Sequence, residues 1–550
     1  MVTAYSIKRS FVRFNTAQFC VLLFILAIFT ISFIFPLGTL FSKAFTGENG
    51  AFAGFANYKS YFGNPSLSVS VWNTIDISLV TTIFSTAFGF LYAYAITRTN
   101  ILGKSFFKYI ALVPIFIPTV VHALGLVYIF GRQGIITRLG FDIELYGRNG
   151  IIISEIIYTF PQAFLLFLVA LEYVDGRLYE ACEVMGVKPL RQFLHVTLPE
   201  MKYTVVNTIF VCFTLAFTDF GAPKVIGGNY NVLATDIYKQ IAGQFNMNMG
   251  AVVGTLLLIP AIISFITGRF VSNKNTSTLN SKTIPLTISK NPVRDAAFFL
   301  FCGFIATFFI FLIISLFIGA FTTYFPYDLN LTLKHFIFNQ SNGGIDCFFN
   351  SVLMSVASAI FGSIFVFVYS YMMEKAEGFG ILTKYGKLLS LLPLAVPGMV
   401  IGVSFIFFFN SGSNPFHFIY GTIIILVLSN IIHYFSVPYL TATGALKKLD
   451  REFEMVAESM NIPRWQTFFR VSVPLSTHAI AEIAMYFFVN SMVTVSAIVF
   501  LYSANFKIAA IAITHMEEAG DISQAAAMSL LILLINVAVR MLYHIIKEKT

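Results

Sequence analysis

Twelve long apolar runs constrain this chain more than any other feature of its sequence. A membrane-spanning helix needs about 20 consecutive, mostly apolar residues. The runs cover residues 17–41, 73–97, 105–131, 150–171, 200–220, 248–270, 296–323, 350–373, 387–410, 417–441, 475–502 and 522–546. Because 57% of the residues are apolar and only 11% are charged, the chain has too little polar surface to cover itself in water. We therefore predict an all-α membrane protein with twelve transmembrane helices in a lipid bilayer.

The first apolar run has two interpretations. Lys8, Arg9 and Arg13 precede it, as basic residues precede the apolar core of a secretory signal peptide. The run is long, however, and no small-x-small cleavage site follows closely. We therefore expect an uncleaved first helix.

The basic residues predict the orientation in the membrane, since cytoplasmic loops carry an excess of Lys and Arg. With both termini in the cytoplasm, 26 of the 35 Lys and Arg lie at the termini or around the even-numbered loops, and 9 lie in the odd-numbered loops. Both termini are therefore predicted to be cytoplasmic. A nucleic-acid partner is not expected, because no clustered basic face with interleaved aromatic residues occurs.

The five cysteines carry no chemical signal of their own. None belongs to a CxxC pair, and three lie within apolar runs, where a small polarizable side chain packs well. Neither a disulfide framework nor a metal site is expected.

An internal repeat divides the chain into two halves. The longest polar stretch, 272–294, predicts a cytoplasmic linker between a first half (1–271) and a second half (295–550), each with six helices. Matching landmarks recur on either side of it: Asn73-Thr74 with Asn350-Ser351, Tyr92 and Tyr94 with Tyr369 and Tyr371, and Pro114 and Pro118 with Pro393 and Pro397.

The prolines of the third and ninth helices, Pro118 and Pro397 among them, leave backbone carbonyls that a neighbouring helix or a water-lined cavity must satisfy. A packing kink explains each pair taken alone. Their recurrence at equivalent places favours kinked helices beside a central translocation pathway.

Two polar loops, 175–199 and 450–474, align at an offset of 275 residues. Each predicts a short amphipathic helix, a turn and a second segment that ends in proline at the membrane entry. Leu178, Cys182 and Met185 share one helical face in the first loop, and Phe453, Ala457 and Met460 do so in the second. Such a face suits a groove on another protein, although an interfacial helix lying on lipid is the alternative.

The two loops resemble the EAA loop of ABC importer permeases, E-A-A-x3-G-x9-I-x-L-P. The second copy is degenerate, with Met455 at the position of Glu180 and Asn461 at that of Gly186. Asn tolerates a left-handed backbone better than most residues, so we expect the turn to persist there. The residues that this resemblance assigns to ATPase coupling are Glu180, Ala181, Glu183, Gly186, Leu198, Pro199, Ala457, Glu458, Asn461 and Pro474.

The resemblance implies a type I importer permease, with its two six-helix halves fused in one chain. It also implies a homodimeric ABC ATPase on the cytoplasmic side, an extracytoplasmic substrate-binding protein and a bacterial plasma (inner) membrane location. ATP and Mg would bind the ATPase, and this chain would bind no cofactor and catalyse no reaction. Its one GKS fragment, Gly103-Lys104-Ser105, has Arg98 in place of the first P-loop glycine and no preceding strand.

The cargo signal is weaker. The stretch from Thr218 to Tyr238 resembles fused permeases that serve ferric iron, 2-aminoethylphosphonate and related phosphorylated solutes, and ferric iron is our first choice. An ion-gradient-driven secondary transporter is the alternative from another class, although it would not need EAA-type loops.

Ionisable residues inside the predicted helices need an explanation, because charge at mid-bilayer is costly. We expect Asp76 and Glu155 to be solvated near helix ends. Asp219 either lines the external gate or caps the Gly-Pro turn that follows it. Glu482 is predicted to face the bundle or the pathway, and His433 is a further candidate.

Overall fold

A computed structural model describes residues 16–47, 49–141, 143–275, 288, 290–340, 343–375, 380–450 and 452–549. Within these residues, nine helices are long and apolar enough to cross a membrane, and three bent helix pairs raise the number of candidate spans to twelve. The predicted all-α membrane fold is confirmed.

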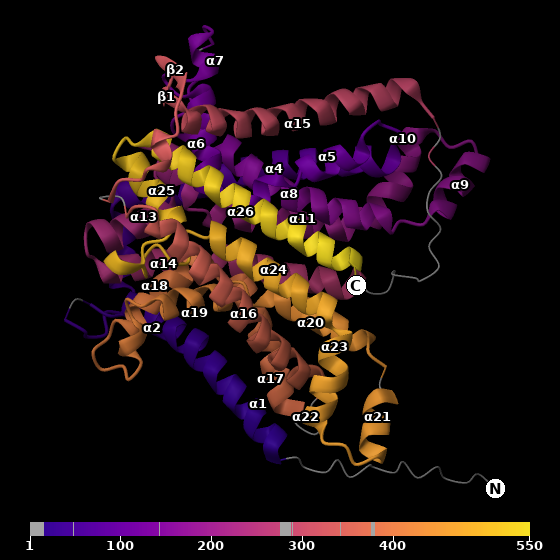
Figure 1. Ribbon diagram of the computed structural model, residues 1–550, viewed down its shortest axis with the longest axis vertical. Helices are drawn as coiled ribbons and strands as arrows, with labels where there is room; N and C mark the ends of the chain where they lie inside the picture. Colours follow the sequence, from indigo (N-terminus) through magenta and orange to yellow (C-terminus); the bar gives the residue numbers. More distant parts are fainter. Residues whose placement is uncertain are drawn as a thin grey trace.

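The first half consists of helices that follow the predicted apolar runs, with short helices between them (Figure 1). They are α1 (Thr16–Phe29), α2 (Phe35–Phe45), α3 (Ala56–Gly63), α4 (Pro65–Arg98), α5 (Lys104–Ile110), α6 (Thr119–Phe130), α7 (Ile135–Arg138), α8 (Arg148–Glu172), α9 (Gly176–Val184), α10 (Pro189–Gln192), α11 (Leu198–Thr218), α12 (Gly221–Ile226), α13 (Leu233–Tyr238) and α14 (Met247–Asn275).

The second half repeats this order and adds one hairpin, in which β1 and β2 pair antiparallel. Its elements are α15 (Pro292–Phe321), β1 (Thr322–Tyr324), β2 (Asp328–Leu331), α16 (Asp346–Lys375), α17 (Gly380–Leu391), α18 (Gly398–Phe409), α19 (Ile423–His433), α20 (Ser436–Lys448), α21 (Glu452–Ser459), α22 (Arg464–Thr467), α23 (Val473–Leu475), α24 (Thr477–Val493), α25 (Ala509–Glu518) and α26 (Ile522–Lys549).

The third span of each half is broken and not merely kinked, which corrects the prediction for 105–131 and 387–410. A residue that precedes proline avoids the helical region, and Ile117 and Val396 are both extended, with ψ of 144° and 117°. The chain therefore leaves the helix there, and α6 and α18 start anew after Pro118 and Pro397.

Neighbouring side chains satisfy the carbonyls that the first break releases. His122 Nε2 donates to the Pro114 carbonyl at 3.1 Å, and Asn536 Nδ2 of α26 donates to that of Phe116 at 2.8 Å. The second contact crosses from one half to the other, so the break is part of the interface between the halves.

Each half also packs its first helix against the other half. α2 packs on α18, whereas α15 packs on α4, α5 and α6. Figure 1 shows α15 along the first-half helices and α1 along those of the second half. The ring of Phe29 lies 4.4 Å from that of Phe435, centroid to centroid, and Ser315 Oγ donates to the Gly125 carbonyl at 3.3 Å. The two repeats consequently form one bundle.

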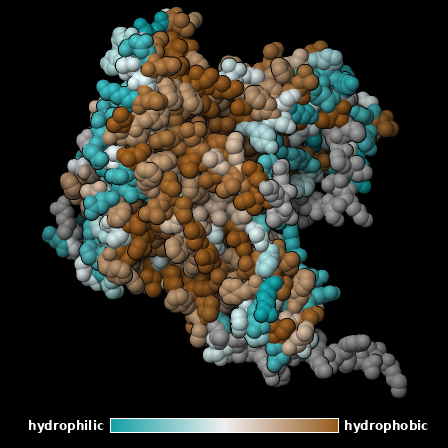
Figure 2. Space-filling model, in the orientation of Figure 1, coloured by the Kyte–Doolittle hydropathy of each residue, from teal (hydrophilic) through white to brown (hydrophobic). Residues whose placement is uncertain are grey.

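Apolar side chains cover the middle of the molecule. In Figure 2 they form a broad band, and hydrophilic side chains gather at the left edge and on the two lobes at the right. Large apolar residues such as Phe24, Ile83 and Phe304 are 65% to 75% exposed. Contiguous exposed apolar surface of this extent marks a membrane or protein contact, which agrees with lipid around the bundle.

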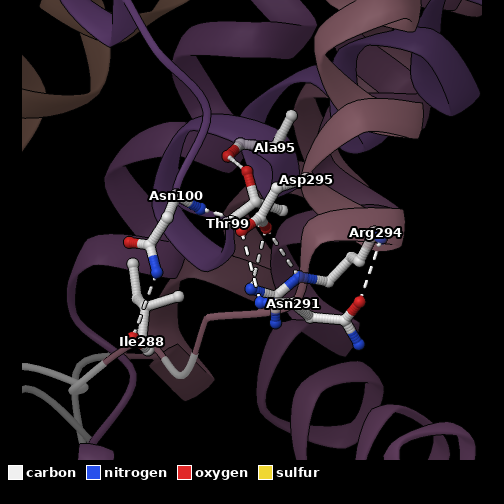
Figure 3. A network of polar contacts seen from close by, with 7 residues as sticks. All are labelled: Ala95, Thr99, Asn100, Ile288, Asn291, Arg294 and Asp295. Atoms are coloured by element: carbon white, nitrogen blue, oxygen red, sulfur yellow. Dashed lines mark hydrogen bonds and ion pairs between the residues drawn. The ribbon is translucent and has the colours of Figure 1, made fainter.

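The end of the predicted linker is fastened to the loop after α4 (Figure 3). Asn291 caps α15 by accepting from Arg294 N at 3.1 Å, and Asp295 accepts from Asn100 N at 3.2 Å. Asn100 Nδ2 in turn donates to the Ile288 carbonyl at 3.2 Å. Both margins of 272–294 are helical, and residues 276–287 and 289 lie outside the described residues.

Candidate functional site

The first polar loop forms the short helix α9 and a left-handed turn. Asp175 caps the helix by accepting from Arg177 N at 3.1 Å. The helix ends at Val184, Gly186 follows with φ of +66°, and Val187 N donates back to the Cys182 carbonyl at 2.9 Å. This hydrogen-bond pattern is that of a Schellman motif, which needs a residue with positive φ after the helix.

The second loop repeats this geometry around α21. Asn461 takes the position of Gly186 with φ of +54°, and Ile462 N donates to the Ala457 carbonyl at 2.8 Å. The expected left-handed turn is therefore present in both loops. The offset of 275 extends to the π-helical turns Phe193–Thr197 and Phe468–Ser472, which lead into the next spans.

The two short helices project from one end of the bundle, on separate lobes (Figure 1). Leu178 and Met185 are 42% and 76% exposed, and Phe453 and Met460 are 49% and 67% exposed. Apolar side chains this open, on helices outside the apolar band, suit a groove on a partner protein. Of the predicted coupling residues, Ala457 is buried and faces the rest of the chain, whereas the others are exposed: Glu180, Ala181, Glu183, Gly186, Leu198, Pro199, Glu458, Asn461 and Pro474.

A basic residue at the end of the second span fastens each loop. In the first half, the guanidinium of Arg98 lies 5.2 Å from the ring centroid of Tyr179 in α9, and Nη2 donates to the Leu171 carbonyl at 2.7 Å. In the second half, Lys375 Nζ lies 2.6 Å from Glu454 Oε1 in α21. Sequence reasoning missed these anchors.

A repeat signal could have found both anchors. Arg98 and Lys375 lie six residues after Tyr92 and Tyr369, the matched tyrosines of the two second spans. Tyr179 and Glu454 share the offset of 275. The first half has a cation–π contact and the second half has an ion pair, so the positions repeat but the residue types do not.

Further contacts hold the loops in place. Tyr179 and Thr197 share a hydrogen bond of 2.7 Å between their hydroxyls, which ties α9 to the following π-helical turn. In the second loop, Arg464 Nη2 lies 2.6 Å from Glu458 Oε1. Glu458 is therefore already paired within the chain, whereas no ion pair of Glu180 occurs in the described residues.

The predicted pathway residues lie apart from the loops. Asp219 accepts from Thr119 Oγ1 at 2.9 Å and from Ala222 N at 3.0 Å. Its second bond caps the start of α12, and its first ties that cap to α6 just after Pro118. Pro397 holds the same place before α18.

Three ionisable residues of the spans differ in their environment. Asp76 pairs with Arg148, whose Nη2 lies 2.9 Å from Oδ1. Glu155 is fully buried, so the prediction that it is solvated is wrong. Its place near the end of the apolar run is covered by other helices, which hydropathy alone does not reveal. Glu482 is exposed on α24, near Tyr543 of α26, and its part in the pathway stays a prediction.

Comparison with known proteins identifies the family. Residues 85–274 and 376–550 match the model of the binding-protein-dependent transport system inner membrane component. The chain belongs to this family. It is thus a multi-pass permease with two fused family units, as predicted, and the alternative of an ion-gradient-driven secondary transporter falls away.

Curated relatives cover most of this permease. It is 28% identical over 487 residues to the ferric transport system permease protein FbpB of Actinobacillus pleuropneumoniae, covering 86% of this chain and 70% of the relative. It is 29% identical over 448 residues to a putative ferric transport system permease protein FbpB 1 of Haemophilus influenzae, covering 78% and 69%. A probable sulfate transport system permease protein of Prototheca wickerhamii matches 34% of this chain at 27% identity.

Proposed function

We propose that this permease imports ferric iron across a bacterial plasma (inner) membrane with energy from ATP. The main support for this proposal is that two relatives named as ferric transport permeases match more than three quarters of the chain. 2-Aminoethylphosphonate or another phosphorylated small solute is the alternative cargo, on the likeness of the stretch from Thr218 to Tyr238.

The energy comes from a partner. A homodimeric ABC ATPase docks on α9 and α21, whose exposed apolar residues fill its grooves. ATP and Mg bind that ATPase, and this chain binds no cofactor and performs no catalysis. Because the Lys- and Arg-rich loops hold both helices, this end and both termini lie in the cytoplasm.

Substrate reaches the opposite end from an extracytoplasmic binding protein. Closure of the two ATPase subunits pushes on the anchored loops, and the bundle changes access from one side to the other. Arg98 and Lys375 make this transmission direct, because each joins a coupling helix to the end of a membrane span.

Uptake into membrane vesicles tests the proposal. Vesicles that contain the permease, its ATPase and its binding protein should accumulate ferric iron when ATP is inside and ionophores have collapsed all ion gradients. Accumulation of 2-aminoethylphosphonate in place of iron would show that 2-aminoethylphosphonate is the transported substrate. Uptake that ignores ATP would overturn the proposed energy source.

A further inference from the structure

A buried polar cluster lies inside the membrane-spanning bundle, away from the coupling loops. Glu155 of α8 is 0% exposed, and neither of its carboxylate oxygens has a hydrogen-bond partner among the described residues. The carboxyl nevertheless lies close enough to that of Asp219 to interact with it. A carboxyl buried inside a membrane bundle is expensive and marks a functional site.

Phenols from both halves complete the cluster. Tyr158 lies one turn after Glu155 and within electrostatic range of Asp219, and also of Tyr434 and Tyr486 of the second half. The rings of Tyr434 and Tyr486 are 6.2 Å apart, centroid to centroid. Polar side chains from both halves therefore lie near one another where the two halves meet. No group of three or more His, Cys, Asp or Glu that could hold a metal occurs in the described chain, and this cluster combines two carboxyls with phenols.

The second half provides a control within the molecule. At the offset of 275, Asn430 stands at the position of Glu155 and Thr494 at that of Asp219. Asn430 is also fully buried, with no hydrogen-bond partner for its amide among the described residues. The same fold therefore forms with neutral side chains at these positions, and the carboxyl pair of the first half is not a requirement of packing.

Asp219 is held in a defined place. Thr119 at the start of α6 and the backbone of Ala222 in α12 both donate to its carboxylate. Gly221 packs so closely on Thr119 that a Cβ there would lie 2.2 Å from its Oγ1. The break at Pro118 and the turn before α12 thus position this carboxylate.

We propose that Glu155, Asp219 and Tyr158 form a transient site for a hard, highly charged cation, ferric iron, on its way through the membrane. The proposal rests on the function proposed above and names the intramembrane residues that carry the cargo. Hard cations take oxygen ligands, and two carboxylates offset their charge in a medium of low dielectric constant. A phosphonate or sulfate anion would instead meet like charge.

Transport by conservative variants tests the site. The complete transporter, reconstituted with its ATPase and binding protein, is compared as wild type, Glu155→Gln, Asp219→Asn and Tyr158→Phe. Each variant should lower the iron transport rate at least about tenfold, because a ligand of the passing ion is lost. The basal ATPase rate should be kept. Asn430→Ala, the matched change in the other half, should transport iron at the wild-type rate.

A spectroscopic measurement separates ligation from packing. Wild-type transporter loaded with ferric iron should show a visible phenolate-to-iron charge-transfer band, and Tyr158→Phe should weaken it. Wild-type transport rates in all three variants, with an unchanged spectrum, would overturn the site while leaving the ferric function intact. If the wild type carries no iron at all, the proposed function fails, and the site fails with it.

Discussion

The guanidinium of Arg98 lies 5.2 Å from the ring centroid of Tyr179, and Lys375 occupies the equivalent place beside Glu454, 2.6 Å from its carboxylate. Each contact joins the end of a membrane span to one of the two short helices, α9 or α21. The first is a cation–π contact with Arg98 only 7% exposed, and the second is an ion pair whose acidic partner is partly exposed.

Loss of the first anchor should uncouple ATP hydrolysis from transport. A cation–π contact that is shielded from water is worth about 2 kcal/mol, so Arg98→Ala should lower substrate-stimulated ATP hydrolysis with the ATPase still bound. Lys375→Ala removes the second anchor and should have a smaller effect, since its ion pair is partly exposed to solvent. ATPase assays on reconstituted transporter measure both. Unchanged coupling in Arg98→Ala would contradict the anchoring role.

The turn residues should respond unequally to substitution. Gly186 has φ of +66°, and beyond its chain neighbours nothing lies within 4 Å of the place that a Cβ would take, so the main cost of Gly186→Val is backbone strain of about 1–2 kcal/mol. Asn461 already carries a Cβ at φ of +54°, so Asn461→Val should cost less and Asn461→Gly should be tolerated. Co-purification of the ATPase with each variant measures the outcome. Equal loss in both valine variants would show that the halves contribute alike.

Charge reversal at Glu180 should weaken docking. The side chain is exposed and lies outside the bilayer, so Glu180→Lys should reach normal membrane levels. If the ATPase groove offers a basic group, like-charge contact costs several kcal/mol, and both ATPase co-purification and stimulated hydrolysis should fall. Glu144→Lys, a change at another exposed glutamate outside the two loops, is the control. Normal co-purification of Glu180→Lys would remove this residue from the interface.

An ion pair joins the halves at α12 and α25 and sets a pH dependence. Lys224 Nζ lies 2.5 Å from Glu518 Oε1, and His515 and Lys224 lower the pKa of Glu518 to about 2. A carboxyl whose pKa is lowered by folding stabilises the folded state at pH values above its unfolded-state pKa. This stabilisation is lost as the pH falls toward about 2. Burial instead raises the pKa of the neighbouring Glu517 to about 7, so stability should fall as pH rises from about 4.5 to 7.

Melting temperatures of the purified permease across pH 5 to 8 test this pair of carboxyls. Glu517→Gln should flatten the decline over that window, whereas Glu518→Gln should lower the melting temperature throughout it. A wild-type curve that rises with pH, or a Glu517→Gln curve that follows the wild type, would contradict the assignment.

Cysteine labelling tests the orientation. In a background without native cysteines, probes at the exposed Asn229 and Asn339 should react with a membrane-impermeant reagent in intact cells. A probe at Glu183, or at Thr276 and Thr550 outside the described residues, should react only after permeabilisation. External labelling of Glu183 would invert the topology.

Local patterns in the sequence determined much of this protein. Apolar runs define the spans because lipid selects each segment by its own hydropathy. The two loops were predictable because they repeat at an offset of 275 residues. Their turns were predictable as well, because each depends on the backbone φ of a single residue, Gly186 or Asn461. The breaks before Pro118 and Pro397 were predicted only as kinks, although the restriction on the preceding residue is also local.

Tertiary structure decided what depends on contacts between distant segments. Hydropathy does not show which face of a helix points into the bundle. It therefore did not reveal that Glu155 is buried or that Asp219 lies near it. The packing of α2 and α15 on opposite halves, and the anchors at Arg98 and Lys375, join residues that are dozens to hundreds of positions apart. Pairing of this kind follows from how the whole bundle fills its interior, which no single segment encodes.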